Sequence, residues 1–268
     1  MKYTPAKRIG FFRKVALSLW HSGGDPSVYG FLDLDLTDSS IEKSPLPFVL
    51  KSLAEVMKKH RELNSILRFG KLYYREQVNI SVLVHIEEQQ RSDLSFAHLT
   101  EVDKMSLQEI RESLGASIPQ IRARKDPRLH RAFQILNALP SFLMKPFLKL
   151  FSFAVHDLNL DLTRWSLPKD PFGAVIVTNV GSLGLRHALV PLVPFSKAVM
   201  MVAVGEVSQQ PKVINGEIVV RSILPLGVTF DHRFFDGAHA AKMLRDFEAH
   251  FHFSGGSLLK TSNGKEQK

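Results

Sequence analysis

Alternation of apolar and polar residues marks a strand near the start of the chain. In residues 31–40, "FLDLDLTDSS", three leucines alternate with Phe31, Asp33 and Asp35. A repeat of two is typical of a half-buried β-strand, since successive side chains point to opposite faces. The pattern therefore predicts a strand whose acidic side chains face water.

Two segments carry apolar residues at helical spacing instead. Residues 47–62 predict one helix. Residues 103–117, "DKMSLQEIRESLGAS", predict a second, with Ser106 as N-cap, Glu109 completing a capping box and Gly115 closing the helix.

Several short apolar runs predict further strands. "ELNSILRFGKLYYREQVNISVLVHI" predicts a hairpin around Gly70-Lys71 and then a strand over residues 78–86. "GAVIVTN", "AVMMVAVGEV" and "EIVVRSILPLGVTFDH" predict three more, with Asn215-Gly216 as a hairpin turn and a final helix over residues 238–251. Strands mixed with helices and hairpins indicate an α/β sandwich.

Residues 129–155, "LHRAFQILNALPSFLMKPFLKLFSFAV", are unusually apolar. Their longest uncharged run, residues 132–144, is shorter than the roughly 20 apolar residues that a bilayer span needs. Pro140 and Pro146 interrupt the segment. Two interpretations stay open: helical pieces that pack on the core, which is favoured, or an element that binds a membrane surface or an acyl chain.

Composition narrows the class of protein. The chain has 268 residues, 44% hydrophobic and 23% charged, as in ordinary globular proteins. It has no cysteine, which excludes disulfides, thiolate metal sites and a cysteine nucleophile, and fits a reducing, cytoplasmic compartment. The basic N-terminal stretch has Arg13 and Lys14 among its apolar residues, so no secretory signal is expected.

The net charge of +9 is concentrated in two places. Residues 1–20 carry five Lys or Arg and no acid, and residues 120–165 carry eight against three Asp. Local basic zones suggest an anionic ligand or surface, with ordinary solvated surface as the alternative. No zinc-finger spacing or RNA-binding aromatic signature is present, so nucleic acid is not an expected partner.

Proton-transfer chemistry is suggested by "VTFDHRFFDGAHAAK", residues 228–242. His232 follows a predicted strand directly, and a histidine pKa of about 6.5 suits taking and returning a proton near neutrality. Asp236 could orient a partner or lock the loop, and Gly237 would let the chain turn tightly into a helix. Taken alone, such a His–Asp pair is more often a surface turn.

A hydroxyl candidate lies in "IVTNVGSLGL", residues 176–185. A strand ends on Thr178-Asn179, and Gly181 and Gly184 bracket the turn that follows. The Thr178 hydroxyl could donate a hydrogen bond to a developing oxyanion. Alone, these residues are also what any turn contains.

Together, these segments resemble a known family. "DHRFFDGA" resembles the D-H-R-x-x-D/N-G-A motif of the acyltransferase (E2) catalytic domain of 2-oxo acid dehydrogenase complexes, and chloramphenicol acetyltransferase shares the shorter H-x-x-x-D-G. "VIVTNVGSLG" is similar to the family segment F-T-I-S-N-L-G, about fifty residues before the histidine. "FLDLDLT", "PFVLKSLAEVMKKHRELNSIL", "VNISVLV" and "MSLQEIRE" follow in family order. The similarity covers most of residues 5–115 and 172–252.

The resemblance implies a fold and an activity. The fold would be a chloramphenicol acetyltransferase-like mixed-sheet α/β sandwich with flanking helices, forming one domain over residues 1–253. Residues 118–170 would be an enlarged apolar and basic insertion, and residues 254–268 a disordered tail. The activity would be transfer of an acyl group between coenzyme A and a thiol or hydroxyl acceptor, with coenzyme A as substrate and no metal.

The resemblance also assigns roles. His232 would be the general base, Thr178 the oxyanion donor, and Asp236 a helper more structural than proton-transferring. Arg13, in "FRKVALSLW", would be a partner for Asp236. Structural support would come from the motif neighbours Asn179, Asp231 and Gly237. Family members are homotrimers with the site between subunits, so the same is expected here.

Some features depart from the family. The chain begins almost at the catalytic domain, so no lipoyl domain or lipoyl lysine is expected in it. "EEQQRSDLSFAHLTEV" stands where the family has a G-L-I-V-P-V-like strand, and the C-terminus is polar. These differences predict a stand-alone trimer outside any large hollow core, with membrane association through residues 129–155 kept open. The alternative to an enzyme is a non-catalytic trimeric scaffold of the same fold.

Overall fold

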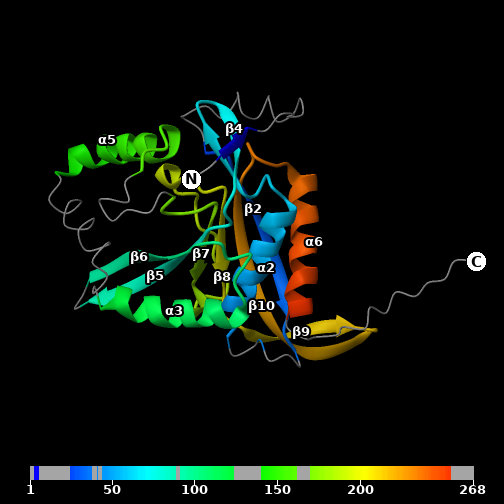
Figure 1. Ribbon diagram of the computed structural model, residues 1–268. Coiled ribbons are helices and arrows are strands. Elements are labelled where there is room, and N and C mark those ends of the chain that lie inside the picture. Colours follow the sequence, from blue (N-terminus) through cyan, green and yellow to red (C-terminus); the bar gives the residue numbers. More distant parts are fainter. Residues whose placement is uncertain are drawn as a thin grey trace, which may run out of the picture.

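The structure of the protein is a computed structural model that describes residues 3–5, 25–37, 41, 44–88, 91–123, 140–161 and 170–254 (Figure 1). Arg13, all of residues 129–139 and residues 255–268 of the C-terminal tail lie outside these ranges. The elements in chain order are β1 Tyr3–Pro5, β2 Ser27–Asp35, α2 Leu46–Lys59, β3 Ser65–Arg68, β4 Lys71–Arg75, β5 Ile80–Glu88, β6 Arg91–Leu99, α3 Leu107–Arg122, α5 Ser141–Ser152, η1 Phe153–Asp157, β7 Val175–Asn179, η3 Gly181–Leu183, η4 Pro194–Ser196, β8 Met200–Val204, β9 Ser208–Ile214, β10 Glu217–Asp231 and α6 Gly237–Ser254.

A seven-stranded mixed sheet forms the centre of the molecule, in the order β2-β10-β8-β7-β5-β6, with β9 paired to β10. The pairs β5–β7 and β7–β8 are parallel, and the other pairs are antiparallel. A three-stranded sheet, β1-β4-β3, lies above one end of the large sheet (Figure 1). This architecture confirms the predicted mixed-sheet α/β fold with flanking helices.

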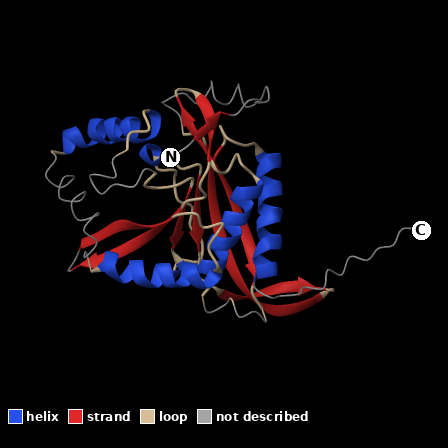
Figure 2. Cartoon of the chain, in the orientation of Figure 1, coloured by secondary structure: helices blue, strands red, loops and turns tan. Residues whose placement is uncertain are grey.

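The main core lies between the large sheet and helices α2, α3 and α6 (Figure 2). Every second residue of β2 points into it, because Leu34 and Leu36 are fully buried while Phe31 and Asp33 are exposed. The predicted half-buried strand is therefore confirmed. Layers of this kind form because a sheet with one apolar face must cover that face with helices.

A second apolar cluster covers the opposite face of the sheet. It contains Phe172, Ile176, Ala198 and Met201, with partly buried residues from the loop before β8 and from the C-terminal end of α5 packed against them. Both faces of β7 and β8 are thus buried, which explains their continuous apolar runs.

The helical predictions are confirmed in type and corrected at one end. Ser106 Oγ accepts a hydrogen bond from the Glu109 backbone, and the Glu109 carboxylate accepts one from the Ser106 backbone, as a capping box requires. Gly115, however, does not close α3, which continues to Arg122. Gly115 lies in the middle of α3 on its exposed side, and the helix continues for two more turns, in which Ile121 is buried.

The two hairpin predictions are confirmed. Phe69 and Gly70 take positive φ angles of 48° and 71° in the turn between β3 and β4. Asn215 and Gly216 take φ angles of 53° and 88° between β9 and β10. Two successive positive φ values suit the tight turn that joins twisted antiparallel strands, which asparagine and glycine adopt most easily.

The apolar segment 129–155 is helical where it is described, but it packs on the core only at one end. Ser152 and Val155 are buried, while Phe142 and Leu150 of α5 are 77% and 66% exposed. The favoured interpretation, packing on the core, is therefore wrong for most of α5. In the described part of the chain, no helix is both long and apolar enough to cross a bilayer.

Candidate active site

The predicted histidine lies where β10 ends. The Asp231 N–H donates to the Val199 carbonyl at 2.9 Å, and the His232 N–H donates to the Pro26 carbonyl at 2.9 Å. The backbone of His232 is therefore held from both sides, by the chain entering β8 and by the chain entering β2. We call this the histidine end of the sheet: the end where β10 stops and β7 and β8 begin.

The tautomer of His232 follows from one contact. Its Nδ1 lies 3.1 Å from the carbonyl oxygen of Phe235. A carbonyl oxygen can only accept, so Nδ1 carries the hydrogen and Nε2 is the basic nitrogen. The half-buried imidazole thus has the tautomer that a general base needs.

Asp231, directly before the histidine, is a structural residue in this arrangement. Its buried carboxylate accepts hydrogen bonds from the Arg233 backbone at 2.9 Å and from Arg233 Nη2 at 2.6 Å. Charge-assisted, bidentate contact of this kind is geometrically specific. The pair locks the residues on both sides of His232.

Asp236 caps α6. Its Oδ1 accepts a hydrogen bond from the His239 backbone at 2.9 Å and lies 2.9 Å from His239 Nδ1. These bonds hold the pKa of the Asp236 carboxyl below its usual value. An ionised carboxylate at the N-cap stabilises the start of the helix, which fits a structural role for Asp236 better than a role in proton transfer. Arg13, its predicted partner, lies outside the described residues.

Gly237 does not perform the conformational task predicted for it. It begins α6 without a positive φ angle, and an added Cβ would meet nothing within 4 Å. The turn out of β10 therefore does not require glycine within a single chain.

The predicted hydroxyl lies at the opposite end of the sheet. Thr178 is half-buried near the end of β7, and the Asn179 side-chain oxygen accepts a hydrogen bond from the Ser182 backbone at 3.2 Å. The following turn needs both its glycines: Gly184 has φ of 77°, and a Cβ on Gly181 would lie 2.4 Å from the Gly205 carbonyl oxygen. We call this the threonine end.

A cavity of about 390 Å³ opens at the threonine end. Its walls come from β5, β6, α3 and the turn after β7, and carry both aliphatic and polar side chains. Its lining residues are Leu46, Val82, Leu83, Val84, His85, Leu94, Ile118, Arg122, Thr178, Asn179, Ser182 and Leu183. The volume lies within the range typical of small-molecule sites.

Three polar residues of this cavity were not singled out from the sequence: His85, Arg122 and Ser182. His85 lies two residues after Leu83 in β5, and Leu83 pairs with Thr178 in the parallel register of β5 and β7. A signal for it existed, because a single histidine interrupts the apolar strand "ISVLVHI" on the face shared with Leu83. Arg122 is found only because α3 runs past Gly115.

The two predicted catalytic residues do not meet within one chain. Thr178 pairs with Ala203, Ala203 pairs with Gly227, and His232 lies five residues beyond Gly227. With about 3.3 Å per residue and about 4.8 Å per strand, they are roughly 16 Å apart along the strands and about 10 Å apart across them. A site that uses both must combine two copies of the chain.

A buried ionic cluster lies at the histidine end. Arg75 Nε donates to the Asp170 carboxylate at 2.9 Å, with both side chains almost fully buried. His156 Nε2 lies 3.9 Å from Asp170 Oδ1, and in the described structure neither atom has a hydrogen-bond partner. Burial lowers the pKa of His156 to about 4, so the ring is neutral at pH 7.

The chain matches the family of 2-oxoacid dehydrogenases acyltransferases (catalytic domain) over residues 32–127 and 170–253. These ranges make up most of its length and include both Thr178 and His232. The chain belongs to this family. The residues between the two ranges include α5 and η1, so the family similarity does not extend to that part.

A curated relative supports membership of this acyltransferase family. The dihydrolipoyllysine-residue acetyltransferase component of the pyruvate dehydrogenase complex of Mycoplasma capricolum is 41% identical over 83 residues. The match covers 31% of this chain and 18% of that protein, so the chain corresponds to a small part of its relative.

Solved structures of the same fold cover nearly the whole chain. A probable dihydrolipoamide acetyltransferase from Listeria monocytogenes has a TM-score of 0.62 at 17% identity, covering 95% of this chain and 97% of its own. The dihydrolipoamide acetyltransferase of Azotobacter vinelandii has 0.57 at 20%, covering 94% and 91%. Chloramphenicol acetyltransferase has 0.50 at 10%, covering 93% and 100%. The predicted chloramphenicol acetyltransferase-like fold is confirmed.

Proposed function

We propose that this protein transfers an acyl group between coenzyme A and a thiol or hydroxyl acceptor, in a homotrimer. Each site would combine His232 of one chain with Thr178 of a second copy. The observation that carries the proposal is the division of the site: a histidine of basic tautomer at one end of the sheet, and a hydroxyl beside a cavity at the other.

The residues of a relative support this assignment. The Azotobacter vinelandii enzyme was solved in an investigation of the role of a serine, a histidine and an asparagine in its catalytic mechanism, the asparagine four residues after the histidine. Here Thr178, His232 and Asp236 follow in the same order, with Asp236 four residues after His232. Threonine for serine keeps the hydroxyl, and aspartate for asparagine keeps a side chain able to cap α6.

The chemistry proceeds by direct attack on the thioester. His232 Nε2 takes the proton of the acceptor thiol, and the sulfur bonds to the thioester carbonyl carbon. The carbonyl oxygen becomes an oxyanion, to which the Thr178 hydroxyl donates a hydrogen bond. Collapse breaks the bond to the coenzyme A sulfur, which leaves as thiol with the proton returned by the imidazolium. Atoms and charge balance without a metal.

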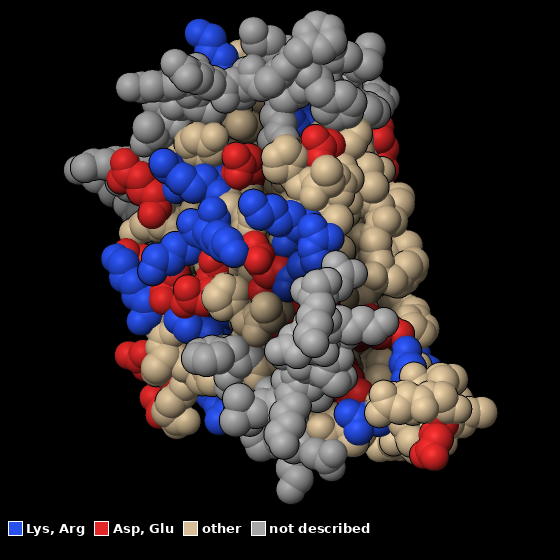
Figure 3. All heavy atoms as spheres, turned by 90° about the vertical axis from the view of Figure 1, so that its right-hand side faces the viewer, with Lys and Arg blue, Asp and Glu red and all other residues tan. Residues whose placement is uncertain are grey.

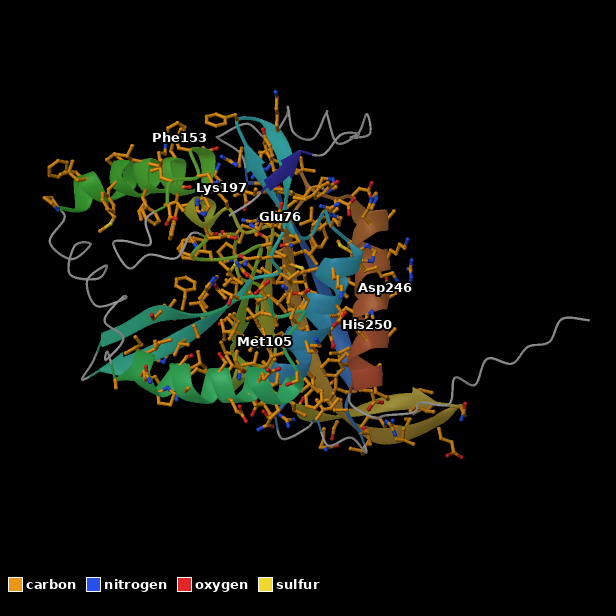
Figure 4. The ribbon with its side chains drawn as sticks, viewed as in Figure 1. Glu76, Met105, Phe153, Lys197, Asp246 and His250 are labelled. Carbon is orange, nitrogen blue, oxygen red and sulfur yellow. The ribbon has the colours of Figure 1, made fainter. Side chains whose placement is uncertain are left out.

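Activity of single variants tests the two roles. Thioester cleavage is measured with acetyl-, longer-chain and branched-chain coenzyme A thioesters, with a thiol acceptor. His232→Ala should lower turnover by about 10²- to 10⁴-fold, and Thr178→Val by about 10²- to 10³-fold. Thr178→Ser should keep most activity, and His250→Ala, near the C-terminal end of α6 (Figure 4) and 18 residues after His232, should change nothing. Cleavage that survives His232→Ala would instead favour a non-catalytic scaffold.

Co-expression of the two inactive chains tests the shared site. Chains carrying His232→Ala or Thr178→Val, each with its own affinity tag, are expressed together and purified through both tags. In a trimer that contains both variant chains, about one site in three receives both intact residues, so activity should return to about a third of the parent value. Mixed trimers with no more activity than either variant alone would contradict the division between copies.

A further inference from the structure

Several strongly exposed apolar side chains lie on α5 and beside it. Phe142 and Leu150 of α5 are 77% and 66% exposed, and Phe69, in the turn after β3, is 63% exposed. Phe69 and Phe153 meet edge to face with ring centroids 6.0 Å apart, so the turn and the helix form one surface. This α5 surface consists of Phe69, Phe142, Leu143, Leu150, Phe153, Leu158 and Leu160.

The α5 surface is held to the body of the protein from beneath. Val155, His156 and Asp157 of η1 are buried, and Asp157 pairs with Lys197 at 3.3 Å. The Arg68 guanidinium also donates to the Asp157 carbonyl at 2.7 Å. Figure 4 shows Phe153 on the outer side, away from the large sheet. The apolar side chains are therefore displayed on a fixed support.

Positive charge borders this surface. Lys145 and Lys149 are exposed on α5, and Lys71 is exposed beside the Phe69 turn. Residues 141–152 contain no acidic residue. Of the two acids in residues 140–161, Asp157 is buried against Lys197, and Asp161 lies beyond η1 at the far end of the segment.

The helix face on the other side of the molecule has a different charge pattern. Figure 3 shows Lys and Arg gathered there with Asp and Glu among them. On α6, Lys242 and Arg245 are followed by Asp246 and Glu248, and Asp246 pairs with Lys59 at 2.8 Å. That surface compensates its own charge, as solvated helices commonly do. On the α5 surface, no acidic residue in the described ranges pairs with Lys145 or Lys149.

We propose that the α5 surface binds the surface of an anionic lipid bilayer, with α5 parallel to the membrane plane. Phenylalanine and leucine side chains would enter the boundary between headgroups and acyl chains, while the lysines contact lipid phosphates. A protein partner is the less favoured occupant, because lysine is depleted in the cores of protein interfaces. At 12 residues, α5 is about 18 Å long, which suits lying on a bilayer and is too short to cross one.

Vesicle sedimentation tests the proposal. The full chain is mixed with phosphatidylcholine vesicles, with and without a third of phosphatidylglycerol. Binding should require the anionic lipid and weaken with salt. Lys145→Gln/Lys149→Gln should weaken it by about thirty-fold, since each lysine near a charged membrane contributes roughly five-fold. Phe142→Ser/Leu150→Ser should weaken it on the order of a hundred-fold. Ile218→Ser, at a residue of β10 that is 78% exposed, is the matched apolar control and should bind normally.

Four results would overturn the proposal: no binding by the parent chain, equal binding to neutral vesicles, undiminished binding by Phe142→Ser/Leu150→Ser, or equal loss with the Ile218→Ser control. The molar mass of each variant, measured by light scattering, tests the alternative that a second copy of the chain covers the α5 surface. If Phe142→Ser/Leu150→Ser leaves vesicle binding intact and lowers the mass, the α5 surface is an interface between copies. All the substituted side chains are exposed, so the circular dichroism spectrum of each variant should match that of the parent chain.

Discussion

The two ends of the large sheet carry the two halves of the proposed site in different ways. At the histidine end, His232 is fixed by backbone hydrogen bonds and the Asp231–Arg233 pair, and the buried Arg75–Asp170 pair lies at the same end. At the threonine end, a glycine turn and a cavity of about 390 Å³ surround Thr178. A base must be held in one orientation, whereas a site for an acyl group must leave room. The difference predicts that substitutions at the histidine end cost the most stability.

Removal of one partner from the buried ion pair should give the largest effect. Arg75→Met leaves the Asp170 carboxylate buried without its cation, which should lower the free energy of unfolding by about 3–5 kcal/mol. Urea denaturation measures this. Lys212→Met, which breaks the exposed pair with Asp33, is the control and should cost less than about 1 kcal/mol. Equal effects would show that the two ends do not differ in the way proposed.

Acid should destabilise the protein through His156. Its pKa is about 4 in the folded protein and about 6.5 when unfolded, so between these values the unfolded chain binds the extra proton. The stabilisation is complete above pH 6.5 and is lost as the pH falls towards 4, by up to roughly 3 kcal/mol. His156→Phe should flatten the stability profile across this window, measured by urea denaturation at each pH. An unchanged slope would contradict the buried neutral histidine.

Close backbone packing should give an intermediate effect at the threonine end. A Cβ at Gly181 would lie 2.4 Å from the Gly205 carbonyl oxygen, so Gly181→Ala must shift the turn after β7. A cost of about 1–3 kcal/mol is expected, with reduced acyl transfer because the turn follows Thr178 directly. Gly237→Ala, where a Cβ meets nothing, is the matched control for stability. If both variants are equally stable, the turn tolerates a side chain.

Most helices, strands and turns could be predicted from the sequence, because interactions between residues close together in the chain determine them. The capping box at Ser106 and the Asn215-Gly216 turn need only neighbouring residues, and both were predicted correctly. The alternation of β2 gave its buried face for the same reason. The positions of Thr178 and His232 at opposite ends depend on strand order, which no local pattern contains.

The missed features have physical causes. Nothing in "SFLMKPFLKLFS" distinguishes an apolar helix packed on a core from one exposed on a surface, because both contain the same residues. The cluster of Arg75, His156 and Asp170 joins three distant segments, so only the folded chain brings it together. His85 and Arg122 became cavity residues in the same way.

The wall of the cavity offers the smallest effect, and its sign is the opposite of the others. Gly115 lies inside α3, one turn before Ile118, and an added Cβ would meet nothing within 4 Å. Alanine favours the helix by about 0.5–1 kcal/mol over glycine, so Gly115→Ala should raise the free energy of unfolding by that amount. Thermal denaturation followed by circular dichroism measures it, with acyl transfer as a second readout. The cavity-lining side chains are unchanged, so turnover should match the parent chain. A loss of stability would mean that α3 ends near Gly115 in solution, and Arg122 would then no longer belong to the cavity.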